Sequence, residues 1–215
     1  VLFYMGLGGF VGWLFAHLRH AAERQHALVR TDTESGLPNQ AALEEDLAAL
    51  ESGSGDARGQ AANLTLVRAL DLGEAMEAIG ADAGAQICPV LAQRFREADQ
   101  RVTGVYRFSA SEMAVLSSAA GSDEALADAA AHLREAAEAP VSVRGIPVCL
   151  EIASGSAAAD GDWIDGQALV RRARIALNAA MEHHRAGEVY EPTLEQVASE
   201  TVRLVAQLRT GLANG

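Results

Sequence analysis

Hydrophobic positions recur along the chain with two different periods, which predict helices and strands. Apolar residues spaced three and four apart indicate amphipathic helices. These helices are expected at 40–50, 122–138 and 166–184, with one or two more over 75–98 that break near Gly80 to Gly84. Short runs rich in Val, Leu and Thr predict strands. The strands are expected at 64–70, 103–108, 113–117, 141–143, 148–154 and 188–190.

The order of these elements predicts the fold class. Helices and strands alternate, and the central strands 103–108 and 113–117 are joined by SASE, a connection short enough for a hairpin. Residues 141–143 and 148–154 are expected to pair with each other. Turn-forming residues cluster at 31–39 (TDTESGLPN). This order predicts an α+β or mixed α/β sandwich built on one sheet that contains antiparallel strands.

The first 16 residues form an uncharged apolar run, and the polar sequence begins at His17. The run is one or two turns short of the roughly 20 residues that a bilayer-spanning helix needs, so we expect the missing part upstream of Val1. We interpret 1–18 as a transmembrane helix and 19–30 as a juxtamembrane connector helix, with a buried helix of a soluble domain as the alternative. Arginines downstream of the run favour a cytoplasmic location for the C-terminal side. A signal peptide is disfavoured because no basic segment precedes the run.

A second helical segment is expected at the C-terminal end, over residues 192–215. Pro192 and a capping box formed by Thr193 and Gln196 mark its start. Leucines at three and four spacing continue to Leu212. We interpret this segment as a connector helix toward a downstream domain.

Composition and charge exclude several classes of protein. The 215 residues include 17 Lys and Arg against 29 Asp and Glu, a formal net charge of −12. This acidity argues against nonspecific nucleic-acid binding, which needs surplus basic residues to displace counterions. An apolar fraction of 49% excludes a wholly disordered chain, and about 150 residues remain between the end segments, enough for one domain. Cys88 and Cys149 lie in apolar runs and are expected as reduced core thiols, which fits a cytosolic domain.

The opening turn and the central hairpin resemble the GGDEF family, the diguanylate cyclase domain that makes cyclic di-GMP from two GTP. The family's opening signature D-x-L-T-G-L-P-N-R is similar to DTESGLPNQ at 32–40, and its hairpin R-L-G-G-D-E-F-A-V-L is similar to RFSASEMAVL at 107–116. Two glycines align the intervening motif D-x-D-x-F-K-x-I-N-D-x-x-G-H-x-x-G-D with 68–85. The resemblance covers about residues 31–191 and implies the family's fold, a central mixed sheet flanked by helices.

The resemblance also implies which residues occupy the positions of the family's metal chemistry. Cyclisation needs Mg²⁺ to position and neutralise phosphates, and Mg²⁺ prefers carboxylate and phosphate oxygens. The two aspartates of the metal motif align with Arg68 and Leu70, and the acidic residue of the hairpin aligns with Ser111. Asp71 would point to the opposite face of a strand. Glu112 is retained, and we interpret it as a remnant or surface charge, so no metal, cofactor or catalytic residue is expected.

The positions for guanine and phosphate recognition differ from the family as well. The guanine-binding Asn and Asp align with Met76 and Ala85, whose side chains cannot make those hydrogen bonds. The phosphate-binding lysine aligns with Met181, which leaves Arg185 as the nearby basic residue. Side chains at the glycine positions of the hairpin obstruct close approach to phosphates. This vestigial hairpin consists of Ser109, Ala110, Ser111, Glu112 and Met113.

Two further patterns are not expected to form sites. Arg96 and Asp99 are similar to the family's inhibitory R-x-x-D product site but lie out of register with the hairpin. His183 and His184 are adjacent on a helix and do not share a face, which favours a solvated helix end over a metal site.

Together these patterns predict a catalytically inactive GGDEF-like module that regulates a cyclic di-GMP signalling protein. In tandem proteins of this class an EAL phosphodiesterase domain commonly follows the connector helix, and this chain contains no EAL motif. We expect the bacterial inner membrane as the location, with the domain in the cytoplasm. A second copy, paired through the membrane and connector helices, and the downstream effector domain are the expected partners. The alternatives are a GTP-sensing pseudo-cyclase, a weak diguanylate cyclase and an unrelated α/β adaptor.

Overall fold

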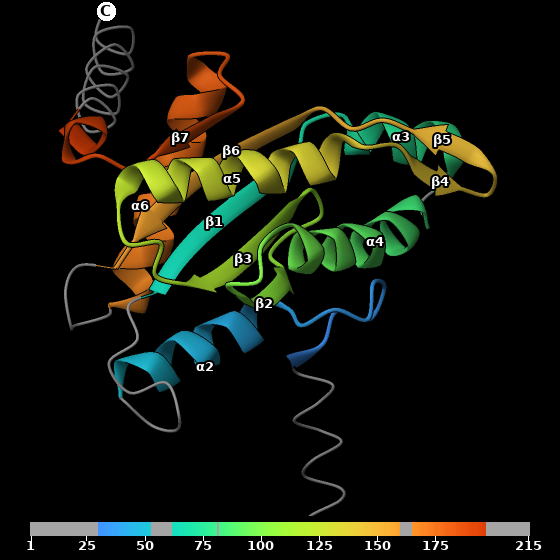
Figure 1. Ribbon diagram of the computed structural model, residues 1–215. Helices are drawn as coiled ribbons and strands as arrows, with labels where there is room; N and C mark the ends of the chain where they lie inside the picture. Colours follow the sequence, from blue (N-terminus) through green and yellow to red (C-terminus); the bar gives the residue numbers. More distant parts are fainter. Residues whose placement is uncertain (1–29, 53–61, 81, 160–164, 197–215) are drawn as a thin grey trace, which may run out of the picture.

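The computed structural model describes residues 30–52, 62–80, 82–159 and 165–196. Its centre is a five-stranded sheet with the strand order β2-β3-β1-β6-β7 (Figure 1). These strands are β1 (Ala62–Ala69), β2 (Val102–Arg107), β3 (Glu112–Ser118), β6 (Ile152–Ala158) and β7 (Gly187–Val189). Neighbouring strands are antiparallel except β6 and β7, which run parallel. The predicted α+β class, with a central mixed sheet that contains antiparallel strands, is therefore confirmed, and most of the strand pairs are antiparallel.

Helices cover both faces of this sheet (Figure 1). They are α2 (Gln40–Glu51), α3 (Leu72–Ile79), α4 (Ala83–Ala98), α5 (Asp123–Glu138) and α6 (Gly166–Glu182). Leu64 and Leu66 of β1 belong to a core with α2 and α6, whereas Val67 and Ala69 belong to a core with α3, α4 and α5. Because side chains alternate between the faces of a strand, Arg68 lies on the same face as Leu66, toward α6.

Local sequence signals explain where the helices begin. The side chain of Asn39 accepts the backbone N–H of Ala42 at 3.1 Å at the start of α2. Asp165 does the same for Ala168 at 2.8 Å at the start of α6. Such side-chain caps satisfy N–H groups that have no partner inside a helix. The expected helices over 40–50, 122–138 and 166–184 are confirmed to within two residues.

Close packing of α6 against β6 depends on a glycine. A Cβ atom built on Gly155 would lie 2.5 Å from the carbonyl oxygen of Ala173 and 2.5 Å from the Cα of Leu177. Only a residue without a side chain allows this approach of helix backbone to strand backbone. The α6 side chains that flank this contact are therefore held near the sheet.

One strand assignment and one cysteine assignment are wrong. The expected strand 148–154 is divided into β5 (Ile146–Val148), which pairs only with β4 (Val141–Val143), and β6, which joins the main sheet. Apolar residues flank this passage on both sides, with only Glu151 between them, so the hydrophobic pattern did not reveal that the chain passes from one sheet to another there. Cys149 lies at this passage and is exposed, whereas Cys88 is buried.

The two end segments fall largely outside the described residues. Of the expected C-terminal helix, 192–196 is helical, and it begins at Pro192 rather than after Thr193. Thr193 therefore lies inside the helix rather than at the predicted cap position, and its hydroxyl donates to Glu191 at 3.4 Å. No helix within the described ranges is long and apolar enough to cross a membrane, and the expected segments 1–18 and 19–29 lie outside those ranges.

Candidate functional site

The β2–β3 hairpin brings the predicted vestigial residues to the end of β1. The backbone N–H groups of Phe108 and Ser109 donate to the carbonyl oxygen of Glu112 at 3.0 and 3.1 Å, which closes the loop. Ser111 accepts the N–H of Ala69 at 3.0 Å, which ties the loop to β1. Ser109 and Ala110 are exposed, and neither has a positive φ. The hairpin therefore forms without the left-handed backbone that glycines would permit. Met113, the last residue of the predicted set, is 3% exposed and packs into the core with α4.

Glu112 lies between two arginines. It is directly opposite Arg68 in the antiparallel pairing of β1 with β3. Arg68 donates through Nε to Glu112 Oε1 at 2.8 Å and also through Nη2. Arg174 of α6 donates through Nη1 to the same oxygen. The Glu112 side chain is 2% exposed, so its interpretation as a surface charge is wrong.

The arginines determine the charge state of this carboxyl group. Burial by itself would raise the pKa of Glu112 because it disfavours the charged form. The guanidinium groups of Arg174 and Arg68 outweigh that effect and hold the pKa below its ordinary value of 4.5. Two permanent positive charges against one negative charge leave a net charge of about +1 at neutral pH.

This arrangement does not fit a divalent cation. Mg²⁺ requires oxygen ligands, and Arg68 and Arg174 offer nitrogen cations that do not lose their protons in proteins. Asp71 lies beyond the end of β1, where its Oδ1 accepts the N–H of Glu151 at 3.0 Å. Within the described ranges, no group of three or more His, Cys, Asp or Glu residues could hold a metal ion.

Three other predicted positions line one hollow beside this cluster. Leu70, Met181 and Arg185 share a cavity of about 370 Å³. The Sδ of Met181 accepts from Arg68 Nη1 at 3.2 Å, which connects the cavity to the arginine cluster. Arg185, which also lines the cavity, pairs with Glu188. Leu70 is 42% exposed.

The predicted guanine positions belong to a filled region between α3, α4 and the hairpin. A Cβ atom built on Gly84 would lie 3.6 Å from Arg107 Nη2 and 3.7 Å from Met76 Sδ. Arg107 is 8% exposed and donates to the sulfur of Cys88 and to the carbonyl oxygen of Ala110. Burial raises the pKa of the Cys88 thiol although Arg107 opposes it. Ala85 is half-buried on α4.

Arg174 is a member of the arginine cluster that sequence reasoning missed. It is seven residues, or about two helical turns, before Met181, so both lie on the same face of α6. Arg174 also lies over the ring of Phe108, 5.2 Å from its centroid. The helical spacing from Met181 is the signal that could have identified it.

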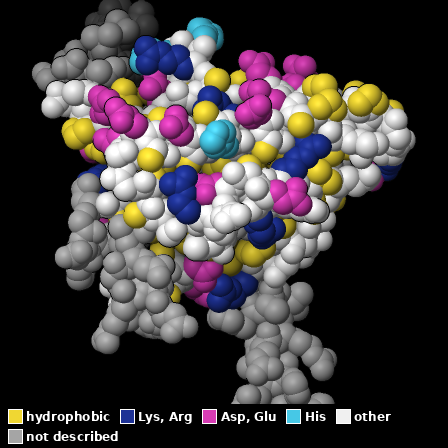
Figure 2. Space-filling view, viewed as in Figure 1, with side chains coloured by type: hydrophobic (Ala, Val, Ile, Leu, Met, Phe, Trp, Pro, Cys, Tyr) yellow, Lys and Arg dark blue, Asp and Glu magenta, His cyan; other side chains and the backbone are white. Residues whose placement is uncertain are grey.

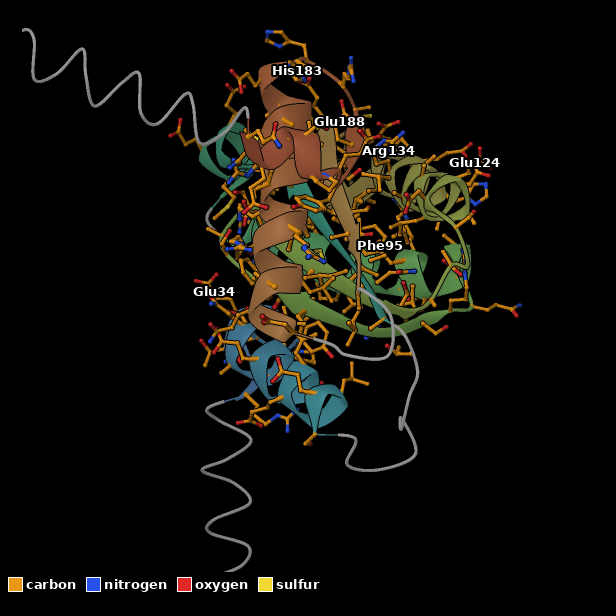
Figure 3. The ribbon with its side chains drawn as sticks, turned by 90° about the vertical axis from the view of Figure 1, so that its left-hand side faces the viewer. Glu34, Phe95, Glu124, Arg134, His183 and Glu188 are labelled. Carbon is orange, nitrogen blue, oxygen red and sulfur yellow. The ribbon has the colours of Figure 1, made fainter. Side chains whose placement is uncertain are left out.

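The remaining sequence patterns do not converge on a site. Asp99 accepts from Arg101 at 3.0 Å, and Arg96 donates to the carbonyl oxygen of Ala92 at 3.3 Å. His183 and His184 are exposed at the end of α6, where Figure 3 shows His183 projecting from the helix. The interpretation of a solvated helix end fits these positions.

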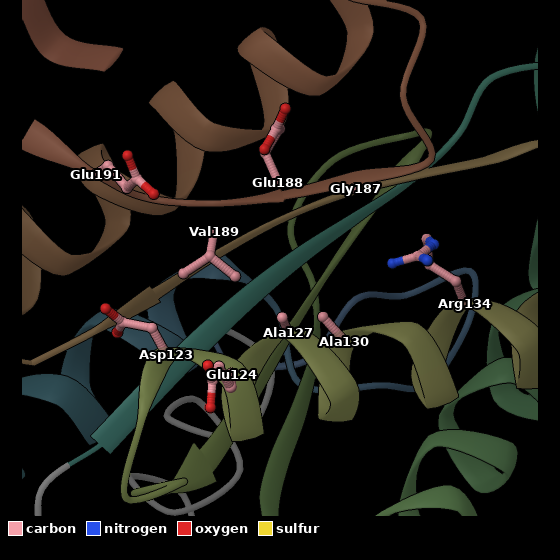
Figure 4. Close-up of a pocket in the computed structure, with 9 residues that line it drawn as sticks. All are labelled: Asp123, Glu124, Ala127, Ala130, Arg134, Gly187, Glu188, Val189 and Glu191. Carbon is pink, nitrogen blue, oxygen red and sulfur yellow. The ribbon is translucent and has the colours of Figure 1, made fainter. Parts of the chain in front are cut away.

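A separate hollow of about 390 Å³ lies between α5 and β7 (Figure 4). Asp123, Glu124 and Glu191 lie at one end of this hollow, and Arg134 at the other. Arg134 donates to Ser154 at 3.4 Å.

On the face seen in Figure 2, basic and acidic side chains are interspersed rather than gathered into a basic stripe.

Comparison with known proteins connects this geometry to one family. The sequence matches the family model described as "Diguanylate cyclase, GGDEF domain" over residues 29–187. The fold is similar to the GGDEF domain of TpbB, also called YfiN, from Pseudomonas aeruginosa, with a TM-score of 0.66 and 23% identity, covering 79% of this chain and 99% of that one. A search of curated proteins finds no match.

Two more solved structures share the fold. A sensory box/GGDEF family protein from Caulobacter crescentus is 27% identical, with a TM-score of 0.61 and coverage of 72% of this chain and 99% of that one. A protein described as a diguanylate cyclase/phosphodiesterase from Caldicellulosiruptor saccharolyticus is 17% identical, with a TM-score of 0.62 and coverage of 78% and 97%.

Proposed function

The chain belongs to the GGDEF family of diguanylate cyclase domains, and from this we propose that it is a catalytically inactive member that regulates a cyclic di-GMP signalling protein. The observation that carries the proposal is the cluster of Arg68, Glu112 and Arg174. In this cluster, guanidinium groups supply the positive charge that a catalytic metal ion would bring.

The buried carboxylate of Glu112 supports the proposal because its negative charge is already balanced by Arg68 and Arg174. Arg68 occupies the position that the family alignment assigns to the first metal-binding carboxylate. A metal ion at this point would lie against two like charges, which disfavours its binding electrostatically. Without a metal ion, the α-phosphate of GTP would lack the Lewis acid that phosphoryl transfer needs.

The side chains at the aligned guanine and phosphate positions support the same proposal. Arg107 and Met76 occupy the space around Gly84. Met181, in place of the phosphate-binding lysine, accepts a bond from Arg68 rather than offering a charge.

The experiment is a direct assay of product. The intact chain is incubated with GTP and either Mg²⁺ or Mn²⁺, and cyclic di-GMP is quantified by chromatography. We expect no product above the background of a protein-free reaction. Product formation that disappears in Glu112→Ala but persists in Glu77→Ala would identify a weak cyclase and contradict the proposal.

The proposed regulatory role also involves the segments before and after the domain. We propose residues 1–18 as a membrane anchor and 192–215 as a connector toward an effector domain, an EAL phosphodiesterase being the favoured one. Residues 31–191 would then form the regulatory domain, paired with a second copy through these helices, in the cytoplasm of a bacterium. The start of the connector is held to the domain, because Tyr190 donates to Glu195 at 2.7 Å.

The membrane and pairing parts of this proposal have their own tests. The intact chain should remain in the membrane fraction after an alkaline carbonate wash and be released by detergent. Chemical crosslinking in those membranes should yield a dimer. Release of the chain by carbonate would refute the anchor, and absence of a crosslinked dimer would refute the pairing.

A further inference from the structure

The charges of the arginine cluster are arranged so that the positive ones reach solvent. The side chains of Arg68 and Arg174 are each 29% exposed, whereas that of Glu112 is 2% exposed. The carboxylate is therefore buried beneath two partly exposed guanidinium groups. The solvent-facing side of the cluster is positive.

Both arginines retain donors that can serve an incoming oxygen acceptor. Arginine carries five N–H donors in a fixed planar arrangement. Arg68 Nη1 donates to the thioether sulfur of Met181, which is a weak acceptor that a phosphate oxygen would displace. The bond from Arg174 to Glu112 engages its Nη1, and its guanidinium is held over the Phe108 ring. A guanidinium group can pair with a phosphate through two parallel N–H···O bonds, so each of these arginines is chemically suited to a phosphate.

From these observations we infer that Arg68 and Arg174 bind a polyphosphate anion directly, without a metal ion. The inference rests on the proposed function, because it assumes a GGDEF site in which guanidinium groups stand in for the metal. A polyphosphate carries several negative charges, and it competes with the single charge of Glu112 for the same donors. Its Mg²⁺ complex carries less negative charge and brings a cation toward two guanidinium groups. Mg²⁺ therefore weakens binding at this site.

The role of Glu112 yields a gain-of-binding test. Glu112→Gln removes the charge that competes with the ligand, so both guanidinium groups become available. We expect this variant to bind tripolyphosphate at least tenfold more tightly than the intact chain. A variant that was merely damaged would not bind more tightly, so this outcome separates a binding role of the cluster from a purely structural one.

The experiment is isothermal titration of the intact chain with sodium tripolyphosphate and, separately, with GTP. Each ligand is titrated in EDTA and again in excess Mg²⁺. We expect binding in EDTA that becomes at least threefold weaker in Mg²⁺. Equal affinity for both ligands would identify a free polyphosphate as the ligand class, and tighter binding of GTP would identify a nucleotide.

Three arginine variants assign the site. Arg174→Gln and Arg68→Lys should each weaken binding at least tenfold, the second because lysine keeps the charge but loses the planar pair of donors. Arg171→Gln is the matched control on the same helix, since its side chain is 62% exposed and faces Glu195, and it should bind like the intact chain. Circular dichroism at the titration temperature confirms that each variant is folded.

Several results would overturn the inference. They are absence of binding by either ligand in EDTA, binding that strengthens when Mg²⁺ is added, and binding that survives Arg174→Gln unchanged. The proposed function is tested separately by the cyclic di-GMP assay. Formation of product alongside metal-free binding would refute the proposed function and leave the anion site standing, whereas no product and no binding would do the reverse.

Discussion

Replacing Glu112 by glutamine removes one negative charge from beneath two guanidinium groups and leaves the side-chain volume nearly unchanged. Removing one partner of a buried ion pair costs about 3–5 kcal/mol because a charge is left uncompensated. Arg68 and Arg174 are each 29% exposed, so water partly solvates the charges that remain. We therefore expect a loss near the lower limit, about 3 kcal/mol, in the free energy of unfolding. For a domain of this size that corresponds to a decrease in Tm of roughly 6–12 °C.

The stability lost in Glu112→Gln should also depend on pH in a predictable direction. The pKa of Glu112 is lowered in the folded protein from an ordinary value of 4.5. A group with a lowered pKa stabilises the folded state fully above its unfolded pKa, and this contribution is lost as pH falls toward the folded pKa. The difference in stability between the intact chain and Glu112→Gln should therefore be constant from pH 7 to about pH 5 and should decrease below about pH 4.5.

The measurement is thermal unfolding by circular dichroism between pH 3.5 and pH 7, in a buffer without phosphate. Glu77→Gln is the control, because Glu77 is an exposed carboxylate on α3 and its replacement should change stability by less than about 0.5 kcal/mol. A loss below about 1 kcal/mol at pH 7 would contradict a buried ion cluster, since exposed pairs contribute that much or less. A stability difference that stays the same at pH 3.5 would show that the charge of Glu112 is not its cause.

Three other changes test the fold and the site. Gly155→Ala should cost about 1–3 kcal/mol, because its methyl group meets the backbone of α6, whereas Gly73→Ala, which meets nothing within 4 Å, should be neutral or stabilising by up to about 1 kcal/mol; equal Tm values for the two variants would refute the packing argument. Asp165→Ala removes the cap of α6 and should cost about 1 kcal/mol in urea unfolding, an expectation contradicted by an unchanged midpoint. The double variant Arg68→Asp with Arg174→Gln replaces both guanidinium groups and adds a carboxylate, so Mn²⁺ should raise its Tm while leaving that of the intact chain unchanged; the same Mn²⁺ response in both proteins would show that the arginines do not exclude a metal.

Local patterns in the sequence predicted much of the secondary structure for a physical reason. Helix periodicity and capping residues act over a few positions, so α2 and α5 were located to within two residues. The hairpin was found because a short polar segment separates two apolar strands. The division of 148–154 into β5 and β6 was missed because strand pairing, rather than local composition, decides where that apolar run changes sheets.

The candidate site was only partly predictable. The resemblance to the family implies that Arg68 stands at the position of a metal-binding carboxylate, which can be read from the sequence motif. The burial of Glu112 and its second partner Arg174 could not be derived in that way, because the contacts join residues 44 and 62 positions apart. Helical spacing from Met181 was the one local indication of Arg174.

By itself, then, the sequence determined the family, the succession of helices and strands, and the absence of carboxylates at the aligned metal positions, because each of these depends on residue identity and short-range spacing. Only the tertiary structure decided which side chains surround Glu112. Antiparallel pairing of β1 with β3 places Arg68 opposite Glu112, and the close approach of α6 at Gly155 brings Arg174 to the same oxygen. These contacts depend on how distant segments pack, because a buried charge takes its partner from whatever side chains the fold brings within reach.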